Sequence, residues 1–162
     1  MKPIKIAIYG LVIVVAVALF CYMHSDRAKI VRLFESAAKI ATREPGESVM
    51  EGAVKAKALA AFFGKSCRFS IPEARLSGLM SNENISGAIL AFRHDASRFS
   101  IEFIELDVEV DSPMAHVDGV VALKGVDGRL NISADESRPF SADLAKNDNG
   151  EWKIISLVLL KR

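Results

Sequence analysis

Residues 98–124 read RFSIEFIELDVEVDSPMAHVDGVVALK, and this alternation determines the fold class. Apolar and polar residues alternate on both sides of Asp111-Ser112-Pro113, which predicts two long antiparallel strands joined by a turn. The parity of the apolar residues changes within the first strand, because Phe103 is followed directly by Ile104. One inserted residue here, a β-bulge, restores a single apolar face and bends the strand. The sequence therefore predicts a strongly curved sheet.

The C-terminal residues predict a second hairpin. Strand-like segments at 140–146 and 151–160 flank Asn147-Asp148-Asn149-Gly150, whose Asn-Gly step is a strong hairpin signal. Pro139 lacks a backbone N–H, so it is expected to limit pairing just before the first of these segments. Three shorter stretches are also assigned: a strand at 67–71, a turn at 126–128 and a strand at 129–133.

Three helices are expected before the long strands. Apolar residues recur at helical spacing from Asp26 to Thr42 and from Asn82 to His94. Ser48 and Glu51 form a capping-box pattern that begins another helix, which should end near Gly64. Its predicted buried face comprises Met50, Val54, Ala58, Ala61 and Phe62. The fold class is therefore α+β: three helices packed on a strongly curved antiparallel sheet, a cone-shaped half-barrel.

An apolar segment precedes the domain. Residues 6–23, IAIYGLVIVVAVALFCYM, contain no charged residue and no proline. A helix of this length spans roughly 27 Å, close to the hydrocarbon thickness of a bilayer, so a single transmembrane helix is predicted. Bulky residues stand where a signal peptidase requires small ones, and Phe20 before Cys21 departs from a lipoprotein signal. We therefore expect an uncleaved anchor.

The charges that flank this segment bear on its orientation. Basic residues on both sides nearly cancel the positive-inside signal, but a short basic tail before an apolar segment is the usual signal-anchor arrangement. Residues 1–25 are predicted to form a cytoplasmic tail and transmembrane helix, and residues 26–162 one soluble domain. In a bacterium this places a single-pass protein in the inner membrane with its domain in the periplasm.

The charge balance argues against nucleic-acid binding, and the positions of the two cysteines argue against a disulfide. Two of the 21 basic residues, Lys2 and Lys5, precede the anchor, which leaves 19 basic and 20 acidic residues after it, a formal charge of −1. A nucleic-acid partner is not expected, because such binding needs a basic surface. Cys21 lies in the apolar segment and Cys67 in the domain, so they cannot form an intramolecular disulfide. Cys67 is expected to be a small buried residue.

The order of elements resembles that of a known superfamily. Together with VEVDSPMAHVDGVVAL at 108–123 and NDNGEWKIISLVL at 147–159, it resembles the nuclear-transport-factor-2-like (SnoaL-like) superfamily from Asp26 to the C-terminus. That superfamily includes enzymes, binding modules and assembly proteins, so the resemblance implies a fold rather than an activity. Its members that resemble ketosteroid isomerase use a tyrosine hydroxyl beside carboxyl groups. Here Tyr9 and Tyr22 both lie in the predicted anchor, so that chemistry is not expected.

His116 and Asp118 are the candidates for acid–base chemistry, with Asp107 as a further acidic group. His116 and Asp118 lie two residues apart on one predicted strand, so their side chains share a face. The opposite face is wholly apolar and is the better candidate for the core: Val117, Gly119, Val121 and Leu123. The sequence therefore predicts that His116 and Asp118 are solvated, and no catalytic residue is assigned.

Aromatic residues could instead line an apolar ligand pocket. The candidates are Phe62, Phe92, Phe99, Phe103 and Trp152, although aromatic residues at this spacing more often form plain core. No metal site is expected, since His24, His94 and His116 show no ligand spacing. No cofactor is expected either: Gly64-Lys65-Ser66 resembles the end of a phosphate-binding loop, but Leu59 replaces its first glycine.

Two functions are compatible with these patterns. The first is a non-catalytic, membrane-anchored envelope protein whose domain binds a protein partner, a second copy of itself or a small apolar ligand. The second is a SnoaL-like cyclase, dehydratase or hydrolase that acts on a small hydrophobic substrate inside the sheet. The enzyme needs a polar group facing the interior beside the aromatic residues, whereas an interior filled by apolar side chains favours the binding protein.

Overall fold

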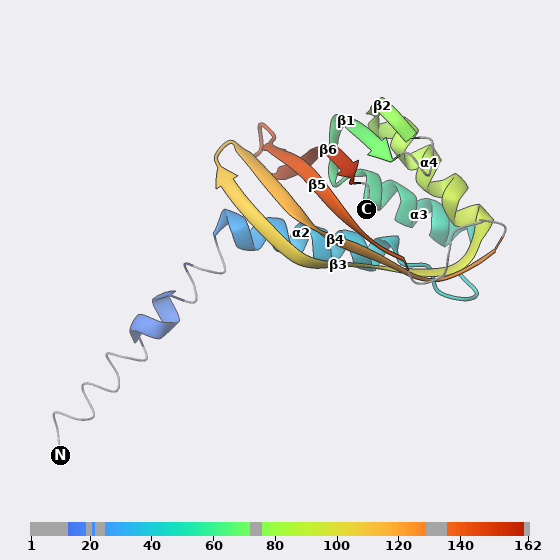
Figure 1. The fold of residues 1–162 in the computed structure, drawn as a ribbon, viewed down its shortest axis with the longest axis horizontal. Coiled ribbons are helices and arrows are strands. Elements are labelled where there is room, and N and C mark those ends of the chain that lie inside the picture. The colour runs from blue at the N-terminus through green and yellow to red at the C-terminus, as the bar shows by residue number, and fades with distance from the viewer. Residues whose placement is uncertain (1–12, 19–20, 22–24, 72–75, 129–135, 161–162) are drawn as a thin grey trace, which may run out of the picture.

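The computed structural model describes residues 13–18, 21, 25–71, 76–128 and 136–160 (Figure 1). In chain order the elements of the domain are α2 (Asp26–Ala41), α3 (Val49–Ala60), β1 (Phe63–Ile71), β2 (Leu76–Ser81), α4 (Asn82–Asp95), β3 (Ala96–Asp111), β4 (Met114–Gly128), β5 (Glu136–Lys146) and β6 (Trp152–Leu159). Helix α2 packs along β3, while α3 and α4 pack on each other and α4 lies beside β1 and β2 (Figure 1). The predicted α+β class is confirmed.

Six strands form one curved, unclosed sheet in the order β2-β1-β6-β5-β4-β3. Four neighbouring pairs are antiparallel, as expected, but β1 pairs with β6 in parallel. The exception has a topological cause. Strands β3 to β6 follow one another as hairpins, whereas β1 comes earlier in the chain and pairs with β6, the last of them. No hairpin turn therefore forces β1 to run antiparallel to β6. Strand β2, which the sequence did not reveal, covers the outer edge of β1.

The predicted bulge in the first long strand is present, one residue beyond the expected position. The register between β3 and β4 shifts between Ile104 and Asp107, and Glu105 adopts a φ of 55°. Phe103 before this residue and Leu106 after it both pack against the buried core. The extra residue thus keeps one apolar face along the whole strand while the strand bends.

The helix starts agree with the sequence. Ser25 accepts a hydrogen bond from the backbone of Ala28 at the start of α2, and Ser81 caps α4 in the same way. At α3 both halves of the capping box form between Ser48 and Glu51. These side chains satisfy backbone N–H groups that have no partner within the helix, which fixes where each helix begins.

The predicted buried face of α3 is wrong. Gly52, Ala56 and Ala60 are the buried residues of this helix, whereas Met50 is 79% and Val54 65% exposed. Small side chains along the buried stripe let α3 and α4 pack closely, because interhelical distance depends on the side chains at the contact. Met50 and Val54 of the predicted stripe therefore point outward.

Two strand boundaries also differ from expectation. Strand β4 continues through the turn predicted at 126–128, and the strand predicted at 129–133 lies outside the described residues. Pro139 was expected to limit pairing, yet it lies within β5 opposite Val120. It takes part through its carbonyl, which accepts a hydrogen bond from the backbone of Leu160 at 2.9 Å.

The predicted anchor, residues 6–23, falls largely outside the described residues. Residues 13–18 are helical with exposed side chains, so the described helices number four rather than the three expected on the sheet. In the described part of the chain, no helix has the length and apolar character needed to cross a membrane.

Candidate functional site

The interior, meaning the space between α2 and the concave face of the sheet, is filled by apolar side chains. Phe34 from α2 meets Phe103 at 5.1 Å between ring centroids, and Phe140 at 5.6 Å. Phe103 and Phe140 are 5.3 Å apart, so the three rings contact one another. Val117 and Leu144 are fully buried in the same cluster. Phe103, a candidate pocket residue, is therefore part of the packed core.

The other candidate pocket residues lie in separate places. Phe92 and Phe99 form an edge-to-face pair at 4.9 Å near the start of β3. Trp152 is buried where β6 meets α2; its Nε1 donates to Asp26 Oδ1 at 3.2 Å, and Lys146 Nζ lies 5.0 Å from its ring centroid. Phe62 is half-buried at the end of α3. These five side chains do not converge on one pocket.

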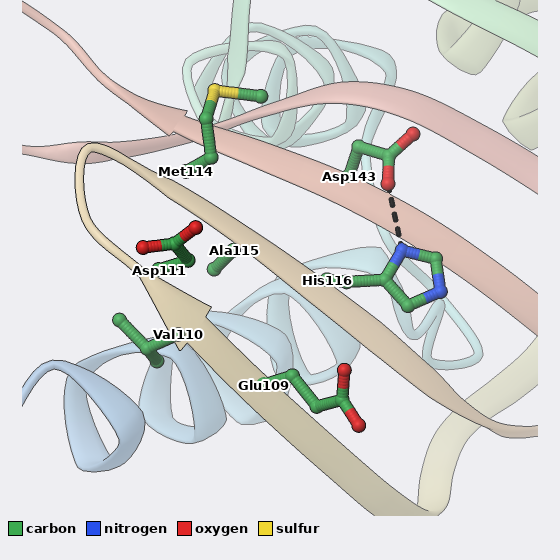
Figure 2. A pocket seen from close by; sticks show the side chains of 7 residues that line it. All are labelled: Glu109, Val110, Asp111, Met114, Ala115, His116 and Asp143. Atoms are coloured by element: carbon green, nitrogen blue, oxygen red, sulfur yellow. Dashed lines mark hydrogen bonds and ion pairs between the residues drawn. The ribbon is translucent and has the colours of Figure 1, made fainter.

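His116 and Asp118 lie on the outer, convex face of the sheet. Strand β4 places fully buried Val117 between them, so both point away from the interior. Pairing with β3 and β5 brings Glu109 and Asp143 level with His116, and Figure 2 shows the three side chains as a row across three strands. Asp107 lies opposite Asp118 on the same face.

The imidazole of His116 has three polar neighbours. Its Nδ1 donates to Asp143 Oδ1 at 2.7 Å (Figure 2). Its Nε2 lies 3.2 Å from Ser141 Oγ and 3.5 Å from Asp118 Oδ2. The hydrogen bond to Asp143 raises the pKa of His116; burial opposes this, and the charges of Asp118 and Glu109 add to the increase. The positively charged form is therefore favoured.

Ser141, His116 and Asp143 have the spatial order of a nucleophile, a general base and an orienting acid. Two features oppose that chemistry. The raised pKa of His116 favours the imidazolium form, which carries a hydrogen on Nε2 and therefore disfavours transfer of the hydroxyl proton from Ser141. In addition, β4 and β5 are interior strands whose backbone N–H groups pair within the sheet, so they offer no oxyanion donors. The geometry supports an acidic surface cluster in which carboxylates surround one histidine.

A shallow pocket of about 350 Å³ adjoins this cluster at the β3–β4 turn. Acidic and apolar side chains line it: Glu109, Val110, Asp111, Met114, Ala115, His116 and Asp143 (Figure 2). A second shallow pocket of about 360 Å³ lies between the α2–α3 connection and the start of β3, where Arg43 and Arg98 contribute positive charge. Among the described residues, no group of His, Cys, Asp and Glu is arranged to hold a metal ion.

Sequence reasoning missed a buried ion pair. Arg93 on α4 is 2% exposed, and its guanidinium donates to both carboxylate oxygens of Glu47 at 2.6 and 2.7 Å. It also donates to the carbonyl of Ala41 at 2.6 Å, which satisfies the C-terminal end of α2. Burial acts to raise the pKa of Glu47, but Arg93 and Lys55 outweigh it, so the net pKa is lowered. One sequence signal could have indicated that Arg93 is buried: it lies at helical spacing from Ile85 and Ile89, on the apolar side of its helix.

Comparison with solved structures identifies the fold. A candidate aromatic ring hydroxylase from Novosphingobium aromaticivorans is similar to this chain with a TM-score of 0.65 at 15% identity, covering 83% of this chain and 87% of that one. An NTF2-like protein from Cytophaga hutchinsonii has a TM-score of 0.64 at 12% identity, with 85% and 99% covered. The domain has the nuclear-transport-factor-2-like fold. The predicted resemblance is confirmed at this level.

A third structure of this nuclear-transport-factor-2-like fold is a candidate scytalone dehydratase from Novosphingobium aromaticivorans. Its TM-score is 0.61 at 17% identity, with 83% of this chain and 82% of that one covered. No protein-family model and no curated protein sequence matches the chain. At these identities the likeness shows the fold alone, and activity must be argued from the site.

Proposed function

We propose that this chain is a non-catalytic, membrane-anchored envelope protein whose nuclear-transport-factor-2-like domain binds a protein partner. The filled interior is the observation that supports this. Phe34, Phe103 and Phe140 occupy the centre of the space in which a substrate or ligand would need room and converging polar groups. The acid–base candidates His116 and Asp118 lie on the opposite face of the sheet.

The proposal includes the anchor and its orientation. Residues 6–23 would cross the inner membrane once, with the domain in the periplasm. Asp26, the first residue of α2, is held to the sheet by Lys146 at 2.8 Å and by Trp152 at 3.2 Å. Only His24 and Ser25 separate the apolar segment from this fixed point, so the domain would sit close to the membrane surface.

Membrane attachment has a direct test. The full chain should remain in the membrane pellet after alkaline carbonate extraction, and external protease added to spheroplasts should degrade the domain. A variant that carries Val14→Arg and Val17→Arg should be released, because charged residues in a spanning helix are costly. Release of the unmodified chain would contradict the anchor, and protection from protease would reverse the proposed orientation.

The alternative is a SnoaL-like cyclase, dehydratase or hydrolase that acts on a small hydrophobic substrate, or a non-catalytic domain that binds such a ligand. The similar solved structures include a candidate hydroxylase and a candidate dehydratase, so this fold is compatible with enzymes. Either alternative requires space inside the sheet, and the enzyme also requires an inward polar group. A test for empty space inside the sheet therefore distinguishes both alternatives from the protein-binding proposal.

Thermal unfolding of the full chain, in the presence and absence of excess indole, makes this separation. Wild type should show no shift in Tm, whereas Phe103→Ala should be stabilised by indole, because an apolar cavity accepts an apolar ring. Phe103→Leu leaves a smaller space and guards against a failure of the alanine variant to fold. Stabilisation of the wild type by several degrees would overturn the proposal in favour of a ligand-binding or catalytic domain.

A further inference from the structure

The start of α2 determines which end of the domain faces the proposed anchor. Met23 is the last residue of the apolar segment, and Asp26 is the first residue of α2. Three Cα–Cα steps separate these residues, so Asp26 lies within about 11 Å of the end of that segment. Ser25 caps α2 with an extended backbone, so α2 begins here as a helix of its own. In the anchored chain, the end of the domain that carries Asp26 therefore faces the bilayer.

Three residues, which we call the Asp26 latch, join this end of α2 to the sheet. Lys146 Nζ on β5 donates to Asp26 Oδ2 at 2.8 Å, and Trp152 Nε1 on β6 donates to Asp26 Oδ1 at 3.2 Å. Lys146 Nζ also lies 5.0 Å from the centroid of the Trp152 ring. The hydrogen bond from Lys146 is the main cause of a lowered pKa of Asp26, so the carboxylate stays charged. The latch thus holds α2, β5 and β6 in one arrangement.

The β3–β4 turn lies at the same end of the domain. The backbone N–H of Lys146 donates to the carbonyl of Pro113 at 2.9 Å, so the latch residue on β5 also contacts the turn. Figure 1 shows the start of α2 and this turn at one end, with the end of α2 and the start of β3 at the other. Helix α2 has 16 residues, which corresponds to a length of roughly 24 Å. The turn is therefore on the side of the anchor.

The turn presents apolar side chains on both faces of the hairpin. Met114 is 44% and Val110 39% exposed, and Pro113 between them is exposed as well. The register places Met114 opposite Asp111 on the outer face and Val110 opposite Ala115 on the inner face. Figure 2 shows the side chains of Met114 and Val110 pointing to different sides of the hairpin. This arrangement suits a tip that enters a lipid interface end-on, because lipid surrounds such a tip on every side.

We propose that the Asp26 latch sets the β3–β4 turn against the bilayer that the anchor enters, with Val110, Pro113 and Met114 among the lipid headgroups. This inference rests on the anchor of the proposed function and adds a second contact with the same membrane. Three apolar side chains bind a bilayer only weakly from solution, because membrane affinity scales with the apolar area buried. The anchor raises the effective concentration of the turn at the membrane, so a weak contact is sufficient.

The charges beside the turn predict which bilayers it contacts. Asp111 is the last residue of β3, and Glu109 lies two residues before it on the same face. Both residues are exposed. Anionic headgroups repel these carboxylates, whereas zwitterionic headgroups carry no net charge. The turn should therefore approach a phosphatidylcholine bilayer more closely than one that also contains phosphatidylglycerol.

Fluorescence quenching measures this contact. The full chain with Cys21→Ser is reconstituted into phosphatidylcholine vesicles that contain a lipid with a nitroxide on its headgroup, and one introduced cysteine carries a fluorophore. A label at Met114→Cys should be quenched several-fold more strongly than one at Glu44→Cys, an exposed position beyond the other end of α2. Phosphatidylglycerol should reduce the difference. Cys67 does not interfere, since burial raises its pKa to about 12 and its thiol is inaccessible.

Two substitutions test the latch. Asp26→Ala and Lys146→Met each remove the 2.8 Å ion pair, and the methionine keeps an apolar stem beside Trp152. Each should lower the quenching of the Met114→Cys label by roughly twofold, because a partly exposed ion pair holds α2 to β5 by a modest free energy. Lys29→Met is the matched control. Lys29 also pairs with Asp26, at 3.3 Å, but both residues belong to α2, so quenching should not change. Thermal unfolding confirms that each variant is folded.

Three results would overturn the inference. The first is equal quenching of the labels at Met114→Cys and Glu44→Cys. The second is unchanged quenching in both Asp26→Ala and Lys146→Met. The third is an emission of the Met114→Cys label that depends on protein density and not on the nitroxide lipid, which would make the turn a contact between copies of this chain.

A label inside the apolar segment separates this inference from the proposed function. A fluorophore at Val14→Cys should be quenched by a nitroxide on the lipid acyl chain whenever the anchor is inserted. If Val14→Cys is quenched and Met114→Cys is not, the contact of the turn is wrong and the anchor stands. If neither label is quenched, the anchor of the proposed function is wrong, and the inference fails with it.

Discussion

The two faces of the central sheet carry different chemistry on adjacent residues. On β5, Phe140 is buried against Phe34 and Phe103, while the next residue, Ser141, faces outward toward His116. On β4, fully buried Val117 alternates with His116, whose side chain is 45% exposed. The difference shows that β4 and β5 place apolar side chains on the concave side and titratable groups on the outer side. A domain of the same shape that catalyses a reaction inside the sheet would need a polar side chain facing the interior at one or more of these positions.

Adjacent substitutions on β5 should show the largest contrast. Phe140→Ala removes a ring from the interior and should lower the free energy of unfolding by ~3–5 kcal/mol. Ser141→Ala should change it by less than ~0.5 kcal/mol, because the hydroxyl is only partly buried on the outer face. Denaturant titration of the full chain measures both. Equal effects at the two positions would refute the assignment of faces.

The buried and exposed ion pairs should differ almost as much. Arg93→Ala leaves Glu47, whose side chain is 3% exposed, with only the partly exposed Lys55 as a charged partner, and should cost ~3–5 kcal/mol. Lys55→Ala removes the other cation of Glu47 but should cost under ~1 kcal/mol, because Lys55 is 38% exposed. Chemical denaturation compares them. If Lys55→Ala lowered the free energy of unfolding as much as Arg93→Ala does, Arg93 would not be the residue that anchors the α2–α3 connection.

Gly119 tests how tightly the interior is filled. An added Cβ there would lie 2.9 Å from Leu106 Cδ2, 3.0 Å from Phe140 Cε1 and 3.3 Å from the carbonyl of Ile104. Gly119→Ala should therefore destabilise the domain by ~1–3 kcal/mol through overpacking. Gly87→Ala on α4, where nothing lies within 4 Å of the added atom, is the matched control and should be neutral or stabilising. A neutral Gly119→Ala would indicate spare room beside Phe140.

The outer cluster should give the smallest effect, visible as pH dependence. The folded-state pKa of His116 is raised by Asp143, so its contribution to stability is fully present below the unfolded pKa of about 6.5 and is lost as pH rises through the higher folded value. Between about pH 5.5 and 8.5, wild type should lose under ~1 kcal/mol relative to His116→Gln, since the site is half exposed. Asp143→Asn should reduce that difference. An unfolding free energy of wild type that rises with pH relative to His116→Gln would reverse the sign.

Much of the fold was predictable because its signals are local. The capping box at Ser48 and Glu51, the Asn-Gly hairpin and the parity change at Phe103 each involve residues within a few positions of one another. The buried face of α3 was not predictable in this way. The helix carries alanine or glycine on nearly every side, so periodicity shows that it is apolar but not which side meets α4.

The outer cluster depends on information that a single sequence does not contain. His116 and Asp118 could be placed on one face from their spacing alone. Asp143 and Ser141 join them only because β4 and β5 pair in one register, with His116 opposite Asp143 and Asp118 opposite Ser141. Arg93 and Glu47 likewise meet across 46 residues, once α4 has packed against the α2–α3 connection.

Xenon binding tests the central claim, that side chains fill the interior, most directly. The ¹²⁹Xe chemical shift is measured against concentration of the full chain, beside Phe103→Ala as a positive control. Xenon enters empty apolar cavities, so wild type should give only the small linear shift of weak surface contact, and Phe103→Ala a larger, saturable one. A saturable shift of similar size in wild type would reveal an unfilled apolar interior, and the account of a packed interior would be wrong.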